Sequence, residues 1–295
     1  TYPHERKPPV ILGNPPANYT QNKEPNPVGS YRREFSLPAE WSGNDVFIHF
    51  GGVMSAFYLW VNGQKVGYSE GSMLPAEFNI TKYLKAGTNN VSAEVYRWSD
   101  GSYLEDQDFW RLSGIYRDVF LYAVPKTYLW DYSLKTTFND DLTKANLDMN
   151  LQFRNAGGAG SYVCDVFLAK YGQAPDEKNP VASIPVSKVS TRTGLKISKS
   201  IVIDRPLLWS AENPNLYQVI FVLKDAATGK ISEVVSTPFG FRKIEIKDQQ
   251  LWVNNQSIKI KGVNRHEHDP FTGRTVSFEV MKRDVELFKQ FNINT

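Results

Sequence analysis

Acidic and aromatic side chains gather along residues 97–111, and their types suit the binding of a sugar. The segment reads RWSDGSYLEDQDFWR and places the carboxylates Asp100, Glu105, Asp106 and Asp108 among two Trp, one Tyr and one Phe. Carboxylates accept hydrogen bonds from hydroxyl groups, and flat rings cover the apolar C–H face of a sugar. The same composition also fits a solvated acidic loop whose aromatic residues belong to a nearby core. The spacing does not match an EF-hand calcium loop.

A second cluster, RHEHD at residues 265–269, contains two of the four histidines of the chain. It follows residues 258–264, which have the pattern of a strand. A neutral imidazole can donate from one ring nitrogen and accept at the other, so a histidine here suits the recognition of a hydroxyl group. Two alternatives exist. The histidines could pair with Glu267 or a backbone carbonyl, or His-x-His could ligate a metal as in amidohydrolase-type enzymes.

The composition of the 295-residue chain allows two or three packed domains, with 41% hydrophobic and 13% aromatic residues. The net charge of +3, without a long basic run, favours neither nucleic acid nor a membrane surface as a partner. No apolar stretch approaches the length of about 18 residues typical of a membrane span. The only cysteine, Cys164, excludes an intrachain disulfide and is expected to be a small buried hydrophobic residue.

Short alternating strands predict a mainly β fold. A Pro- and Asn-rich arm up to about residue 29 precedes strands near 31–38, 45–51, 90–98 and 115–124. Asn62-Gly63 separates the alternating runs 57–61 and 64–68. This dipeptide predicts a two-residue hairpin, because a type I′ turn needs positive φ at both central residues. We therefore expect an antiparallel β-sandwich in residues 1–124.

A second all-β unit is expected over residues 125–242, a length that suits an immunoglobulin-like sandwich. From residue 243 the pattern changes. Asn254-Asn255 predicts a hairpin, and a helix is expected at 278–291 with Ser277 as its N-cap. Strand, polar loop, helix and a new strand at Ile293 are typical of the opening of a βα barrel. One such unit cannot close a barrel, so we expect the chain to be a piece of a larger protein. The sequence does not determine the compartment and leaves both cytoplasm and periplasm open.

Several long segments resemble the family 2 β-galactosidases of the glycoside hydrolases, in the order expected for that family. The resemblance rests on GGVMSAFYLWVNGQKVGYSEGSMLPAEFNIT, WSDGSYLEDQDFWRLSGIYRDV, LLWSAENPNLY, GFRKIEI and KGVNRHEHDP. It implies a jelly-roll sugar-binding domain at 1–124, an immunoglobulin-like β-sandwich at 125–242 and an incomplete TIM-barrel catalytic domain at 243–295, which contributes the first βα unit of a (β/α)8 barrel.

The resemblance also implies roles for two residues of this chain. Asp108, the second Asp of DQDFWR, would contact a sugar hydroxyl and help to hold a sodium ion, a task that suits a hard oxygen ligand. Arg111 could instead pair with Asp108. His266, the first His of NRHEH, would bind sugar hydroxyls. Asp100, Glu105 and Asp106 are expected to form turns and surface ion pairs.

No catalytic residue is assigned within the chain. A retaining glycosidase needs two carboxyl groups about 5–5.5 Å apart. The resemblance implies that both are glutamates beyond Thr295, together with most ligands of the Mg²⁺ that accompanies Na⁺ in the complete enzyme. The chain alone is therefore expected to be inactive.

The resemblance implies substrates that are galactosides, either lactose-like or galactose-containing oligosaccharides, and it is compatible with a homo-oligomer. Two alternatives remain at this stage. One is a non-catalytic carbohydrate-binding or structural module, and the other is a related family 2 β-glucuronidase or β-mannosidase.

Overall fold

The computed structural model describes residues 26–105, 110, 112–157 and 160–295. The described residues form two compact units. The first contains the described residues up to Ala123 and the segment Arg265–Val285, and the second contains the described residues of Val124–Asn264 and the segment Glu286–Thr295. Most of the N-terminal arm, which was expected up to about residue 29, lies outside the described residues, as does the expected ligand Asp108, and β1 already begins at Val28.

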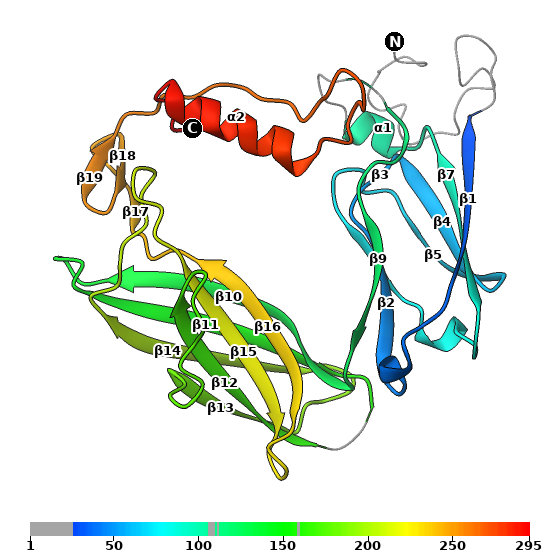
Figure 1. Ribbon diagram of the computed structural model, residues 1–295, viewed down its shortest axis with the longest axis horizontal. Coiled ribbons are helices and arrows are strands. Elements are labelled where there is room, and N and C mark those ends of the chain that lie inside the picture. Colours follow the sequence, from blue (N-terminus) through cyan, green and yellow to red (C-terminus); the bar gives the residue numbers. More distant parts are fainter. Residues whose placement is uncertain (1–25, 106–109, 111, 158–159) are drawn as a thin grey trace. The chain divides into compact units, whose positions relative to one another are not determined.

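The first unit is a β-sandwich (Figure 1), as the sequence predicts. One sheet has the strand order β1-β7-β4-β5, the other has the order β6-β2-β9, and β3 pairs with β8. Two 3-10 turns, Ala39–Trp41 and Thr81–Tyr83, and one short helix, α1 (Gly101–Leu104), connect strands. The strands are β1 (Val28–Phe35), β2 (Asp45–Phe50), β3 (Val53–Met54), β4 (Ala56–Val61), β5 (Gln64–Ser69), β6 (Ala76–Asn79), β7 (Asn89–Tyr96), β8 (Gly114–Ile115) and β9 (Val119–Val124).

The core of this sandwich follows from alternation along the strands. On β4, Phe57, Leu59 and Val61 are at most 2% exposed, whereas Tyr58 and Trp60 point to the other face and are half-buried. Burial of each such apolar side chain contributes about 1.5–3 kcal/mol. Inward residues of the neighbouring and facing strands complete the core: Val46, Ile48, Phe50, Ala93 and Val95.

The predicted hairpin at Asn62-Gly63 is confirmed. The two residues have φ values of 51° and 78°, and they connect β4 to β5. The side chain of Asn62 also donates to the carbonyl of Tyr83 at 2.9 Å and to Asn89 Oδ1 at 2.8 Å. The turn is thus tied to two further segments of the sandwich.

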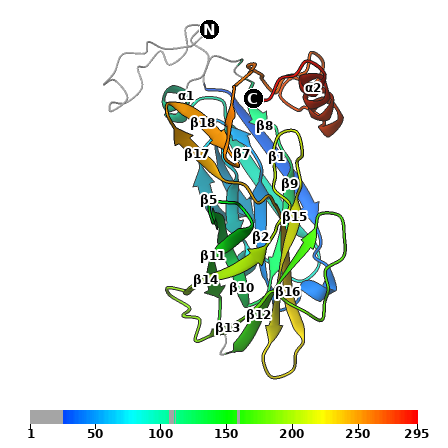
Figure 2. The ribbon, with the colours of Figure 1, turned by 90° about the vertical axis from the view of Figure 1, so that its left-hand side faces the viewer.

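The second unit is also a β-sandwich (Figure 2), with sheets of order β10-β11-β14 and β13-β12-β15-β16. Its core contains five alternate residues of β11, from Ala145 to Phe153, which are at most 1% exposed. Cys164 is buried as predicted, and burial raises the pKa of its thiol to about 12. The strands are β10 (Thr127–Phe138), β11 (Lys144–Asn155), β12 (Ser161–Lys170), β13 (Ala182–Ser187), β14 (Leu195–Asp204), β15 (Tyr217–Asp225) and β16 (Ile231–Phe239).

The last part of the chain contains three short strands and one long helix. β17 (Ile244–Lys247), β18 (Gln250–Val253) and β19 (Gln256–Ile258) form a small sheet, and the predicted hairpin at Asn254-Asn255 joins the last two. Helix α2 (Phe278–Gln290) begins after Ser277, whose Oγ accepts the N–H of Val280 at 3.4 Å. The predicted helix and its N-cap are therefore confirmed.

The prediction of a strand through residues 258–264 is wrong, because β19 ends at Ile258 and residues 259–268 form neither strand nor helix. Two backbone hydrogen bonds link this segment to the end of the described chain. The N–H of Asn294 donates to Lys261 O at 3.0 Å, and the N–H of Val263 donates to Thr295 O at 3.1 Å. Two bonds are too few to form a regular ladder, which a parallel strand needs on its paired edges.

No helix in the described part of the chain has the length and apolar character needed to cross a membrane.

One carboxylate in the second unit lies in an unusual environment. Glu233 on β16 accepts the backbone N–H of Leu129 at 2.8 Å, where the register of β10 against β11 shifts. Burial raises the pKa of Glu233 from 4.5 to about 7, against the opposing effect of this hydrogen bond. The ionised form is therefore disfavoured in the folded chain.

This raised pKa predicts a pH-dependent stability. The favourable contribution of protonated Glu233 is complete below pH 4.5 and is lost as the pH rises to about 7. Glu233→Gln keeps the acceptor and removes the charge, so it should raise the free energy of unfolding above neutral pH by up to about 3 kcal/mol. At about pH 4 the substitution should have little effect on the free energy of unfolding.

Urea denaturation across this pH range measures the effect. The exposed residue Glu177 offers a matched control, and Glu177→Gln should leave the profile unchanged. An equal gain from Glu233→Gln at acidic and alkaline pH would contradict the raised pKa.

Candidate functional site

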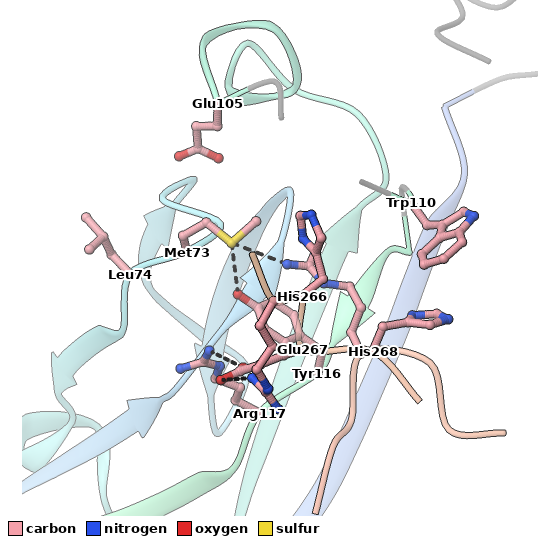
Figure 3. Close-up of a pocket in the computed structure, with 11 residues that line it drawn as sticks. Met73, Leu74, Glu105, Trp110, Tyr116, Arg117, His266, Glu267 and His268 are labelled. Carbon is pink, nitrogen blue, oxygen red and sulfur yellow. Dashed lines mark hydrogen bonds and ion pairs between the residues drawn. The ribbon is translucent and has the colours of Figure 1, made fainter. Parts of the chain in front are cut away.

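A cavity of about 930 Å³ lies within the first compact unit (Figure 3). One wall comes from loops of the sandwich, and the other comes from the segment between β19 and α2. The lining residues are Met73, Leu74, Glu105, Trp110, Tyr116, Arg117, Arg265, His266, Glu267, His268 and Arg274.

The sandwich wall depends on contacts to Ser72, in the loop between β5 and β6. The hydroxyl of Tyr116 donates to the carbonyl of Ser72 at 2.5 Å. On the other side, the backbone N–H of Ser72 donates to both carboxylate oxygens of Glu105 at 3.2 Å each. These bonds position Met73 and Leu74, which follow Ser72 and line the cavity. Glu105 thus supports the cavity, a role that the sequence did not predict.

Ion pairs hold the second wall. Oε2 of Glu267 lies 3.2 Å from Nη2 of Arg117, a residue that follows β8. Oε1 of Glu267 lies 3.8 Å from Nη1 of Arg265. Arg265 in turn pairs with Asp284 of α2 at 2.7 Å. Each of these pairs is partly exposed and therefore worth at most about 1 kcal/mol. Together they connect the loop to both a strand end and the helix.

His266 lies on this second wall, between Arg265 and Glu267, and its side chain is exposed. The structure therefore brings this predicted sugar-binding residue to the cavity. Both of its sequence neighbours are held by ion pairs, which limits the movement of the backbone that carries the imidazole. Its contact with a sugar stays a prediction.

His268 and Trp110 form one side of the cavity (Figure 3). The centres of their rings lie 4.1 Å apart, and the ring planes make an angle of 31°. Trp110 is 63% exposed, so much of the indole remains accessible. Nδ1 of His268 is buried and has no hydrogen-bond partner among the described residues. An exposed indole beside polar groups suits stacking with the apolar face of a sugar.

Arg274 lies against soft and aromatic groups. Its guanidinium stands 4.7 Å from the ring centre of Tyr116 and 3.3 Å from the sulfur atoms of both Met54 and Met73. Burial lowers the pKa of Arg274. Sequence analysis did not identify Arg274, Tyr116 or Arg117 as site residues. Tyr116 and Arg117 lie in a segment that carries the resemblance, but no role was assigned to them there, and the three residues meet only in the folded chain.

In the described ranges, no three His, Cys, Asp or Glu side chains form a group that could hold a metal. Asp108, the expected sodium ligand, and Arg111, its alternative partner, lie outside those ranges. The site that can be described is thus a polar and aromatic cavity with hydrogen-bond donors and acceptors, which suits a polyhydroxylated ligand.

Three family models match consecutive parts of the chain. Residues 11–125 match the model described as "Glycosyl hydrolases family 2, sugar binding domain". Residues 127–242 match "Glycosyl hydrolases family 2", and residues 244–295 match "Glycosyl hydrolases family 2, TIM barrel domain". The matches to the sugar-binding and TIM-barrel domains cover the two walls of the cavity.

Curated relatives with substantial sequence identity are β-galactosidases. The protein from Priestia megaterium (strain DSM 319 / IMG 1521) is 43% identical over 271 residues, which is 91% of this chain and 26% of the relative. The protein from Yersinia pestis bv. Antiqua (strain Angola) is 41% identical over 299 residues, or 95% of this chain and 27% of the relative. The chain thus spans about a quarter of the length of these relatives.

Solved structures confirm the fold. The β-glucuronidase of Bacteroides uniformis superposes with a TM-score of 0.79 at 22% identity, over 91% of this chain and 33% of that chain. A glycosyl hydrolase family 2 member from Bacteroides cellulosilyticus DSM 14838 superposes with a TM-score of 0.78 at 22% identity, over 90% of this chain and 36% of that chain. At this identity the likeness concerns the fold alone.

The hydrogen bond from Tyr116 to Ser72 predicts a measurable contribution to stability. Tyr116→Phe removes the hydroxyl and leaves the Ser72 carbonyl without this donor, so the free energy of unfolding should fall by about 1 kcal/mol. Urea denaturation measures the loss. The matched control is Tyr171→Phe at a side chain that is 59% exposed, where the change should stay within about 0.5 kcal/mol. Equal effects of the two substitutions would contradict the structural role of the Tyr116 hydroxyl.

Proposed function

Because this chain belongs to glycosyl hydrolase family 2, we propose that the protein containing it hydrolyses terminal β-linked galactosides with retention of configuration. The observation that carries this proposal is the position of His266 on the cavity, between two residues held by ion pairs. The identity of more than 40% to two β-galactosidases supports galactose over other sugars. The substrate class is lactose-like galactosides or galactose-containing oligosaccharides.

In this proposal the chain binds and orients the sugar. His266 reads a hydroxyl group through a neutral imidazole, which donates at one nitrogen and accepts at the other. Trp110 covers an apolar face of the sugar, and Asp108 accepts a further hydroxyl bond. Binding groups of this kind raise the rate when they bind the transition state more tightly than the ground state.

The bond-breaking carboxyl groups are proposed to lie outside this chain. Retention requires an acid/base and a nucleophile about 5–5.5 Å apart. Of the two glutamates on the cavity, Glu267 is held by Arg117 and Arg265, and Glu105 by the backbone of Ser72. These contacts hold both carboxylates in place, so we assign both glutamates a supporting role in the walls of the cavity. The chain of 295 residues alone should therefore show no turnover.

We also propose that the complete protein requires Na⁺, with Asp108 as one ligand, and Mg²⁺. A carboxylate is a suitable oxygen ligand for either ion. Assembly into a homo-oligomer and the division into domains at residues 124 and 242 likewise stay proposals. Membership of the family leaves the amidohydrolase interpretation of His266 and His268 without support.

The roles of the two sugar-binding residues predict a loss of activity in the complete protein. His266→Ala and Asp108→Ala should each lower kcat/KM on an aryl β-galactoside by about 100-fold, as expected for the loss of a bond formed in the transition state. His266→Asn, which keeps a donor and an acceptor, should recover part of the loss. His49→Asn, at a histidine that pairs with Glu77 on the sandwich, is the control and should stay near wild type.

The same assay distinguishes the alternatives. NMR of the first-formed anomer should show the β-anomer, as retention requires. Turnover of a β-glucuronide or β-mannoside without turnover of the galactoside would keep the family and replace the substrate. Absence of turnover on all three would favour the carbohydrate-binding module.

Removal of sodium provides a separate test of Asp108. If this residue is a ligand, Asp108→Asn should raise the Na⁺ concentration needed for half-maximal activity, whereas His266→Asn should not. An unchanged sodium requirement in Asp108→Asn would contradict the proposed ligand.

A further inference from the structure

Four aromatic side chains cluster on the outer face of the sheet β1-β7-β4-β5, whose strands β7, β4 and β5 are labelled in Figure 1. Tyr58 and Trp60 of β4 point away from the core, because Phe57, Leu59 and Val61 occupy the alternate positions. Tyr68 of β5 is the register partner of Tyr58, and Tyr96 belongs to β7 on the opposite side of β4. None of these four side chains lines the cavity that contains His266.

The rings form one connected group around Tyr58. Its ring centre lies 4.8 Å from that of Tyr68, 6.0 Å from that of Trp60 and 6.0 Å from that of Tyr96. Tyr68 is 43% exposed and the other three are half-buried. Because three paired strands carry these rings, their positions are set by the sheet and not by a loop.

Charged groups stand among the rings. The hydroxyl of Tyr68 donates to Glu70, and that of Tyr96 donates to Glu94. Burial and the bond to its carboxylate raise the pKa of each tyrosine, so both hydroxyls remain donors at neutral pH. Each carboxylate has about four acceptor positions, and one tyrosine hydroxyl uses one of them. The ammonium of Lys65 lies 4.0 Å from the ring centre of Tyr58 and adds donors.

This combination argues for a sugar and against a protein partner. The centre of a protein–protein interface is depleted of Lys, Glu and Asp, because a buried charge that loses its water destabilises the complex. Here Lys65 lies over the central ring, and Glu94 is the register partner of Tyr58. A sugar offers hydroxyl groups to charges of both signs and an apolar face to the rings, so it needs no burial of an unpaired charge.

We propose that this outer face is a second glycan-binding surface. An oligosaccharide of hexoses binds with one ring stacked on Tyr68 and with hydroxyl groups bonded to Glu70, Glu94 and Lys65. The surface holds a polymeric or branched substrate near the protein and takes no part in bond cleavage. Glycan binding at this outer face does not depend on the activity proposed for the cavity.

Isothermal titration calorimetry of the full chain with a thio-linked β-1,4-galactotetraose, which glycosidases do not cleave, tests the proposal. Tyr68→Ala should weaken binding by about tenfold, the range of a lost ring contact. Tyr68→Phe keeps the ring and should stay within about twofold of wild type. Because the cavity is itself a proposed galactoside site, the titrations are repeated in the His266→Ala background, where the Tyr68-dependent binding should persist, so failure of the cavity as a galactose site would be seen separately.

Folding and specificity require two controls. Tyr171→Ala removes an exposed tyrosine of the second unit and should not affect binding, and thermal denaturation of Tyr68→Ala should show an intact fold. Absence of binding by the wild-type chain would overturn the proposal. So would binding that Tyr68→Ala leaves unchanged, or a dimer that dissociates on Tyr68→Ala, since the latter would make a second copy the occupant of this face.

Discussion

The pleat of β4 is the constraint on which the first unit depends. Successive side chains of a strand point to opposite faces, so the run from Phe57 to Val61 places three apolar residues in the core and two aromatic residues outside. A shift of one residue would expose Phe57 and Leu59 and bury Tyr58. The hairpin at Asn62-Gly63 opposes such a shift, because its two left-handed residues define where β4 ends and β5 begins.

The register of β4 and β5 also determines where the loop after β5 begins. Beyond β5, the loop that contains Ser72 is held from both sides by Tyr116 and Glu105. Each bond contributes about 1 kcal/mol, which is small beside the apolar core. The burial of apolar surface therefore forms the unit, and polar contacts select the positions of the cavity-lining side chains. This separation of apolar burial from polar positioning suits a binding site, where the placement of the lining side chains matters more than additional stability.

The cavity and the outer face use related chemistry in different ways. In the cavity, Trp110 stands beside His268 on loops, and ion pairs hold the wall that carries His266. On the outer face, Tyr58 and Tyr68 stand on paired strands. Loops allow residues distant in sequence to converge on one ligand, whereas strands present a broad and rigid surface to an extended one. A chain that binds glycans at both places would combine recognition of one sugar with retention of a longer chain.

Local pattern was sufficient for much of the fold. The hairpin at Asn62-Gly63, the burial of Cys164 and the helix after Ser277 depend on turn geometry, alternation and capping, which act between residues close in sequence. The resemblance carried by the RHEHD segment likewise pointed to His266 as a site residue. The strand expected up to Asn264 was wrong because a strand is defined by partners that local pattern does not supply.

Only the tertiary structure decided which side chains meet around His266. Arg117 reaches Glu267 across 150 positions of sequence, and Arg274 reaches Met54 across 220. Arg274 lies outside the segments that carry the resemblance, and Arg117 lies in one of them without a role assigned to it. A long side chain can also find many partners at little difference in energy. The amino-acid sequence thus determines the strands, turns and types of chemistry, because these follow from neighbours along the chain. The composition of the cavity follows from how the sandwich places its loops, because that depends on the packing of residues far apart in sequence.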